Sequence, residues 1–443
     1  MKEIRGYVTR SVLSTFGLSL YILADTFFIA NGVGTLGLTA LNIALPLFNL
    51  LNGLGLLLGM GGATLFVLKG GQKNYFSQLL LTGIIIGLLF TLLGLIFAAP
   101  LASLLGASLA TLPLTTTYLR FILIMAPFFI CNNLVLAFIR NDHNPQLAMK
   151  AMLFSSLFNI IFDYIFVFPM NMGMAGAALA TVLAPVLSLL ILSTHKRKAN
   201  RRLIWQFTLP KFKTISCSTQ LGLASFLTEM STGISILVFN QVLLALSGDI
   251  AVAAYGVLAN ILLVGLSLFT GVAQGIQPLI SQAAAKKEET KVFSYLRYGF
   301  TVSLFLAFLL YLVITLFKFP IVGLFNRDHD ATLTHLATKG MGIYFLALFG
   351  ACFNIVFSIF FSAVGYAKQS FAVALLRGYV LILPFVILLG KTFGIVGVWS
   401  SLPLSEFLTL LIASLLFIQV KKVIAAIFPI KRAKIKRESR LIL

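Results

Sequence analysis

Long apolar segments recur along almost the whole chain, and they constrain its fold more than any other feature. A helix of about 20 apolar residues crosses the roughly 30 Å hydrocarbon core of a bilayer. The segments are too long and too evenly apolar for the strands of a membrane barrel, which alternate over about ten residues. Backbone groups in lipid must be hydrogen-bonded within the protein, which leaves helices. The sequence therefore predicts an all-α polytopic membrane protein.

Composition supports this class and argues against others. Hydrophobic residues make up 59% of the 443 residues, charged residues only 10%, and the mean hydropathy is +1.03. A soluble domain has roughly 25% charged residues. The net charge of +21 does not indicate nucleic-acid binding, because the basic residues lie in short connectors between apolar segments. Cys131, Cys217 and Cys352 form no CxxC or Cys/His pattern, so we expect no disulfide framework, zinc site or cofactor.

Twelve transmembrane helices are expected. Their approximate ranges are 9–30, 37–68, 77–100, 117–140, 147–169, 173–194, 219–247, 252–284, 294–325, 339–365, 371–390 and 394–420. The first range has a basic start but an acid inside its apolar run, so we interpret it as a retained helix rather than a cleaved leader. The connectors then alternate, with 28 of the 33 basic residues on one side. This bias predicts that both termini are cytoplasmic.

The sequence carries a weak internal repeat. An offset of 214 residues superposes Gly34 on Gly248 and Gly61 on Gly275, and an offset of 221 superposes Asn133 on Asn354 and Gly173 on Gly394. These identities fall at equivalent places in the order of the helices. We therefore expect two six-helix lobes in the same orientation, residues 1–194 and 217–443, joined by a basic cytoplasmic linker, 195–216.

Three acids lie well inside apolar ranges: Asp25, Asp163 and Glu229. A carboxylate at the bilayer centre costs about 2.5–3.5 kcal/mol on insertion scales, so these groups must face protein or water. The alternative is that they serve as hydrogen-bonded contacts between helices. That alternative is stronger for Glu229, which could lie near the cytoplasmic mouth.

Helix rise places several oxygen-bearing groups at one depth in the first half. Asp25, Asp163 and Thr181 all fall slightly to the outer side of the midplane, and Asn159 lies one turn before Asp163 on the same face. Carboxyl groups with neutral oxygen neighbours suit a proton or an alkali cation. The second half lacks these acids, so the symmetry of the fold does not require them.

Other residues carry weaker predictions. Asn240, Gln274, Gln277 and Asn354 are candidates for lining a central cavity, although the sequence does not decide which face they take. Arg377 is interpreted as a cation that reaches the membrane interface. Glu406 is left undecided between mid-span and span end. Pro384 should distort its helix.

Four stretches together resemble the multidrug and toxic compound extrusion (MATE) family, particularly its DinF-like and MepA-like bacterial branch. They are ADTFFIANGVGTLGLTALNIALPLFNLLNGLGLLLGMGGATLF, LFNIIFDYIFVFPMNMGMAGAALATVLA, SFLTEMSTG and GVAQGIQPLISQ, in family order over roughly residues 8–420. The resemblance implies a proton- or sodium-binding aspartate at Asp25, with Asn159, Asp163 and Thr181 completing that site and Glu229 as a second acid in the substrate cavity. The acid that other branches carry in helix 10 has no counterpart in FSAVGYAKQSF, which favours the N-terminal site.

The leading hypothesis is therefore a secondary antiporter in the bacterial inner membrane. It would export cationic or amphipathic compounds in exchange for protons or sodium by alternating access, as a monomer that needs only small molecules and the bilayer as partners. A lipid-linked precursor flippase and a non-transporting membrane scaffold remain alternatives. An enzyme is not expected, because no nucleophile–base pair or metal cluster appears, and the ion at the cation site would be the only metal.

Overall fold

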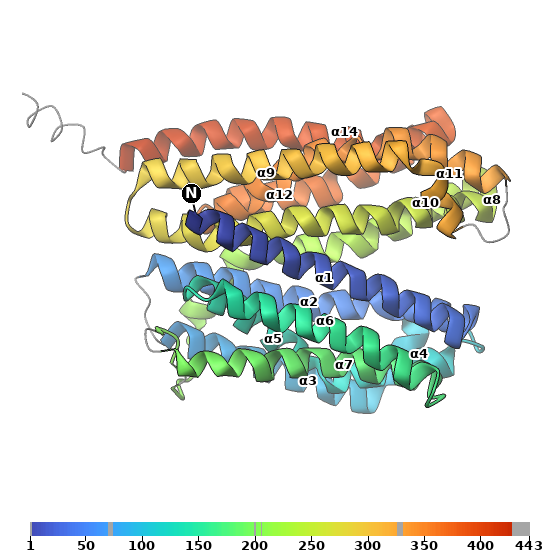
Figure 1. Cartoon of the computed structure of the whole chain (residues 1–443), viewed down its shortest axis with the longest axis horizontal. Coiled ribbons are helices and arrows are strands. Elements are labelled where there is room, and N and C mark those ends of the chain that lie inside the picture. The colour runs from blue at the N-terminus through green and yellow to red at the C-terminus, as the bar shows by residue number, and fades with distance from the viewer. Residues whose placement is uncertain (1, 70–73, 199–200, 205, 326–330, 428–443) are drawn as a thin grey trace, which may run out of the picture.

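The computed structural model describes residues 2–69, 74–198, 201–204, 206–325 and 331–427, and within these ranges it contains helices and connectors but no strand (Figure 1). The helices are α1 (Lys2–Gly32), α2 (Thr35–Leu68), α3 (Asn74–Leu104), α4 (Leu112–Ile124), α5 (Ala126–Asn141), α6 (Pro145–Val167), α7 (Gly173–Ser193), α8 (Phe212–Ala285), α9 (Glu289–Leu316), α10 (Lys318–Phe325), α11 (Ala331–Tyr344), α12 (Ala347–Ala363), α13 (Ala367–Leu375) and α14 (Ile382–Ile427). A short 3₁₀ helix covers Thr194–Arg197, and a π-helical turn covers Leu376–Val380.

Twelve membrane crossings follow when the breaks in these helices are counted in the described ranges. The 74-residue α8 is interrupted at Ser247 and Gly248, and α14 is interrupted at Gly394. The apolar stretch Ala367–Ile424 has 58 residues, far more than the about 20 needed for one crossing. Conversely, α4 with α5 and α11 with α12 each make one bent crossing, with angles of 52° and 49°. In the described ranges nine helices are long and apolar enough to cross a membrane, eleven crossings result when the two bent pairs are included, and dividing the 58-residue stretch at Gly394 gives the predicted twelve.

Three predicted ranges differ in detail from the observed helices. The range 117–140 is broken at Met125, where Pro127 follows at the start of α5 and cannot donate a backbone hydrogen bond. The range 339–365 is also two helices, with no proline at the break. The range 294–325 ends at Leu316, and the separate short helix α10 follows it.

The repeat inferred from the sequence reappears in the backbone. Gly34 and Gly248 both have positive φ, at 88° and 70°, and so do Gly173 and Gly394, at 55° and 60°. These four turns lie at one end of the molecule and need glycine, because other residues are strained at such angles. The breaks at Met125 and Leu346 also stand at the 221-residue offset. We infer from these matched turns that the chain is built as two six-helix lobes.

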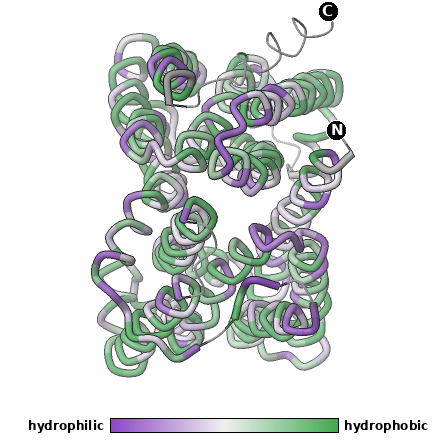
Figure 2. The backbone as a smooth tube through the Cα atoms, turned by 90° about the vertical axis from the view of Figure 1, so that its left-hand side faces the viewer, coloured by the Kyte–Doolittle hydropathy of each residue, from purple (hydrophilic) through white to green (hydrophobic). Residues whose placement is uncertain are grey.

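Buried apolar side chains form two separate core clusters. One gathers residues between Ile29 and Leu203, and the other gathers Ile4, Tyr7 and Val8 with residues from Phe239 to Ile424. In Figure 1 the helices of the first cluster lie below, those of the second cluster lie above, and α1 runs between them. Figure 2 shows the same two groups from the end. Helix α1 thus contributes its first turns to the C-terminal lobe and its last turns to the N-terminal lobe.

The lobes touch closely at the end where α2 and α8 finish, which we call the basic end because Lys69, Lys286 and the segment 195–198 lie there. A Cβ atom at Gly61 of α2 would collide with the Ser218 carbonyl of α8, and one at Gly222 of α8 would collide with the Leu57 carbonyl of α2. Small residues allow helix backbones to approach in this way. The glycine-rich tract in α2 therefore serves packing between the lobes, whereas Gly271 and Gly275 of α8 serve packing against α1.

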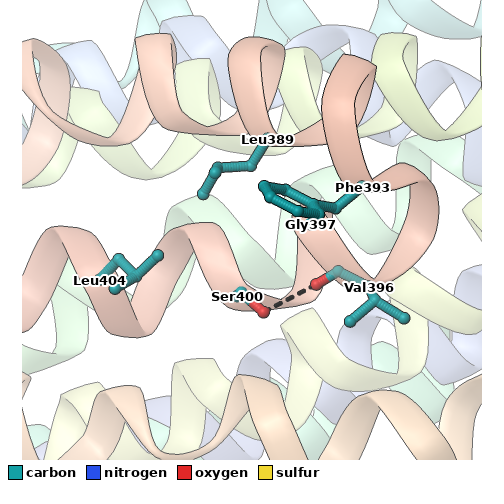
Figure 3. A pocket seen from close by; sticks show the side chains of 6 residues that line it. All are labelled: Leu389, Phe393, Val396, Gly397, Ser400 and Leu404. Carbon is teal, nitrogen blue, oxygen red and sulfur yellow. Dashed lines mark hydrogen bonds between the residues drawn. The ribbon is translucent and has the colours of Figure 1, made fainter.

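At the opposite end, the turn at Gly394 folds α14 into a hairpin. An apolar groove of about 270 Å³ lies in this hairpin between Leu389 and Phe393 on one arm and Ser400 and Leu404 on the other (Figure 3). The Ser400 hydroxyl is satisfied by the Val396 carbonyl at 2.8 Å, so the groove presents few polar groups. We assign it no role beyond contact with lipid.

The connector between the lobes is fastened to the N-terminal lobe. The buried Asp142 carboxylate accepts hydrogen bonds from His195 Nε2 at 2.7 Å and from the backbone N–H of Arg202 at 3.0 Å. Further along, the Gln206 N–H donates to Ser77 Oγ at 3.0 Å. The described part of the predicted linker 195–216 is therefore bound to the first lobe at His195, Arg202 and Gln206, and its last residues, from Phe212 on, already belong to α8.

Asp142→Asn should release this connector. The substitution removes charge-assisted hydrogen bonds worth about 1.5–3 kcal/mol each and places amide hydrogens against the donors that now face the carboxylate. We expect faster tryptic cleavage at Arg197, Lys198, Arg201 and Arg202 in the detergent-purified protein. Glu288→Gln, which removes an exposed pair with Lys291, is the matched control. Equal cleavage rates for parent and Asp142→Asn would contradict the prediction.

Candidate functional site

A pair of buried carboxyl groups occupies the interior of the N-terminal lobe. Asp25 of α1 is 6% exposed and Asp163 of α6 is fully buried. Their carboxyl groups lie within hydrogen-bonding reach of each other. One oxygen of each, Oδ1, has no partner among the described residues. Such unsatisfied buried oxygens are rare in folded proteins and need an explanation.

Asn159 and Thr181 complete the group. In the amide orientation that satisfies both neighbours, Asn159 donates to Asp163 Oδ2 at 3.1 Å and accepts from the Thr181 backbone N–H at 3.3 Å. The Thr181 hydroxyl oxygen is buried and has no partner among the described residues. The structure thus brings together all four residues that the sequence analysis placed at one depth, and three of their oxygens are left without hydrogen bonds.

Two tyrosines that the sequence analysis did not identify also belong to this site. Tyr118 of α4 is buried near Thr181, and it lies within electrostatic range of both aspartates. Tyr21 lies one turn before Asp25 on α1, within range of Asp25, Asp163 and Glu229. The spacing of four residues between Tyr21 and Asp25 could have revealed the first of them.

This geometry suits a proton or an alkali cation. Two buried carboxyl groups within hydrogen-bonding reach repel each other when both are ionised, and a proton or a cation bound between them removes that repulsion. The unpaired oxygens of Asp25, Asp163 and Thr181 are available as acceptors or ligands. Loss of the bound ion would place two negative charges close together and favour a rearrangement of α1 and α6.

Glu229 differs from the aspartates in its surroundings. It lies on α8 beside Gly53 of α2, where the two lobes meet. Its side chain is half-buried, it has no hydrogen bond among the described residues, and its oxygens are not among the fully enclosed ones. A single accessible carboxylate between the lobes can attract a cationic group without sharing a proton with a second acid.

The candidates for a central cavity are placed differently from what the sequence suggested. Gln274, Gln277 and Asn354 are buried and hydrogen-bonded. They therefore do not border an open space in this structure. Asn240 is half-buried on α8, and its contribution to a cavity stays a prediction.

The surroundings of Arg377 differ from those expected from the sequence. Its Nε donates to Glu406 Oε1 at 2.6 Å, and Asn354 donates to Glu406 Oε2 at 2.7 Å. The interpretation of Arg377 as an interfacial cation was wrong, and Glu406 is a buried mid-span acid. Pro384 has no N–H to donate to Val380, and Leu381 N–H instead reaches the Leu376 carbonyl in the π-helical turn that holds Arg377.

The family described as MatE matches residues 11–165 and 221–388, well over half of the chain. The "Multidrug export protein MepA" of Staphylococcus aureus (strain MSSA476) is 28% identical over 94% of this chain and 93% of its own length. The MepA of Staphylococcus saprophyticus is 28% identical over 87% of each.

Solved structures agree in fold. An outward-facing multidrug resistance MATE transporter of the MOP superfamily superposes with a TM-score of 0.89 over 96% of this chain and 97% of its own, at 22% identity. The MATE multidrug transporter DinF-BH, in complex with R6G, superposes with a TM-score of 0.86 over 94% of this chain and 95% of its own, at 25% identity.

Proposed function

The chain belongs to the MATE family of transporters, and from this premise we propose that it is a proton-coupled secondary exporter of cationic or amphipathic compounds. Members of the family are transporters and not enzymes. The relatives named as multidrug export proteins support the export of small molecules. The contact between the carboxyl groups of Asp25 and Asp163 is the observation that carries proton coupling.

In this proposal the aspartate pair and Glu229 have different roles. The Asp25–Asp163 pair, enclosed by Asn159 and Thr181, takes up a proton from outside. Glu229, accessible between the lobes, receives the positive charge of the drug. Protonation of the aspartates changes the packing of α1 against α6. Because the two ends of α1 belong to different cores, its movement is transmitted to both lobes.

The orientation of the protein follows from its charges. We place the basic end in the cytoplasm of a bacterial cell, because positively charged connectors are retained on that side. The close contact between the lobes at Gly61 and Gly222 then closes the cytoplasmic side, and the lobes must separate there for a drug to enter. The protein acts as a monomer in the inner membrane and needs no cofactor.

Transport in proteoliposomes tests the proposal. We expect uptake or release of a fluorescent lipophilic cation when a pH gradient is imposed, with proton movement in the opposite direction, in the absence of sodium. A requirement for a sodium gradient would replace the proton with sodium as the coupling ion. Movement of labelled lipid-linked saccharide without movement of the cation would favour a flippase, and no movement of either would favour a scaffold.

A further inference from the structure

Buried polar side chains connect the two lobes at the basic end. Asn141 of α5 donates to Gln277 Oε1 of α8 at 2.9 Å, and Gln277 in turn donates to Thr64 Oγ1 of α2 at 2.8 Å. The neighbouring Arg140 donates to Gln274 Oε1. All five side chains are nearly inaccessible, although they belong to helices of different lobes. They form a continuous bridge, which we call the polar bridge.

The polar bridge lies within the tightest contact between the lobes. Thr64 follows Gly61 by one turn on α2, and Gln274 and Gln277 flank Gly275 on α8. At Gly61 the backbones of α2 and α8 approach too closely for a Cβ atom. The hydrogen bonds of the bridge must therefore break whenever the lobes separate at this end, and while they are intact water is excluded.

Arg140 has no acidic partner in the described part of the chain. The ion pairs found there are His195–Asp142, Lys291–Glu288 and Arg377–Glu406. Among the described residues, the Arg140 side chain makes one further polar contact, with Met152 Sδ at 3.0 Å. A buried guanidinium that no carboxylate neutralises is a fixed positive charge.

The nearest acid along the chain does not cancel this charge. Asp142 follows Arg140 by two residues, but its carboxylate is directed to the connector and is engaged by His195 and by the backbone N–H groups of Arg202 and Leu203. Fixed positive charges at narrow constrictions exclude protons and metal cations from membrane pores. Arg140 lies in the sealed contact between the lobes, where its positive charge can exclude protons and metal cations in the same way.

We propose that the polar bridge is the cytoplasmic gate of the transporter and that Arg140 makes the closed gate tight to protons and other small cations. The assignment of this end to the cytoplasm rests on the proposed function. An exchanger that is open to the outside must not let protons pass to the cytoplasm without drug moving outward. Arg140 would supply that barrier, while the amides and Thr64 would hold the lobes together.

Cross-linking tests the gate. Cysteines at Asn141 and Gln277, in a background with Ser at positions 131, 217 and 352, are joined with a short bifunctional thiol reagent. We expect the cross-linked protein to lose at least nine-tenths of its export and to regain it after treatment with a reagent that cleaves the linker. Each single-cysteine variant controls for modification alone. Full export by the cross-linked protein would overturn the assignment of the gate.

Proton leak tests the role of Arg140, and it requires no knowledge of the drug. Liposomes containing Arg140→Gln are compared with parent and Arg140→Lys liposomes under an inside-negative potential, without drug. We expect a several-fold faster leak for the Gln variant and near-parent leak for Lys, which retains the charge. Equal leak for Gln and parent would refute the barrier. If the parent exports no drug, the proposed function fails, but the leak comparison still decides the role of Arg140.

The fold of each variant must be checked separately. Gel filtration and thermal unfolding show whether the leak of Arg140→Gln arises from a damaged protein. In that case both Arg140→Gln and Arg140→Lys would unfold at a lower temperature than the parent. The cross-linking experiment keeps Arg140 unchanged, so it decides the gate even if Arg140→Gln cannot be purified.

Discussion

Asp163→Asn should abolish gradient-driven export while leaving the protein at least as stable as the parent. The variant keeps the shape of the side chain and its hydrogen bond to Asn159, but it cannot gain or lose a proton. It also removes one of two adjacent buried carboxyl groups that repel each other when ionised, so folding is not penalised. Export in proteoliposomes and the thermal unfolding temperature in detergent measure the two effects.

The combination of results is what identifies the site. Loss of export with an unchanged or raised unfolding temperature separates coupling from folding. Glu288→Gln is the matched control, since it neutralises an exposed carboxylate at the basic end and should retain export. Undiminished export by Asp163→Asn under a pH gradient would refute proton coupling through this pair.

Arg377→Met should strongly destabilise the C-terminal lobe. It leaves the Glu406 carboxylate buried without its cation, and breaking a buried ion pair in this way costs about 3–5 kcal/mol. The remaining donor, Asn354, cannot neutralise the charge. We expect a clear drop in the apparent unfolding temperature, compared at a single scan rate because large membrane proteins unfold irreversibly.

The double variant Arg377→Met with Glu406→Gln separates the charge from the packing. Glutamine keeps an acceptor for Asn354 and carries no charge, so most of the lost stability should return. If the double variant were as unstable as Arg377→Met, the loss would come from the shape of the methionine rather than from the unpaired carboxylate.

The sequence was sufficient for features that depend on position along the membrane normal. Hydropathy gave twelve crossings, and helix rise gave the common depth of Asp25, Asp163 and Thr181, because both follow from residue counts. The matched glycines Gly34 and Gly248 were also detectable, since a turn with positive φ requires that residue type.

Features that depend on the rotation of a helix about its axis were not predictable. Helices that are apolar all round have no preferred face, so the sequence could not show that Arg377 points to Glu406 across 29 residues. For the same reason, Gln277 was a candidate for lining a cavity, with its face undecided, whereas it lies in the contact between the lobes. Tyr118 was missed because tyrosines near the ends of membrane helices usually mark the lipid interface.

The placement of α1 has a consequence for the order in which the protein is made. Its first turns pack on α8 around Gly271 and Gly275, residues synthesised long after α1 has entered the membrane. Until then Ile4, Tyr7 and Val8 have no protein to cover them, although the remainder of α1 can already settle against α6. The N-terminal half is therefore not a finished unit when its last helix emerges from the ribosome, and its assembly is completed only by the half that follows.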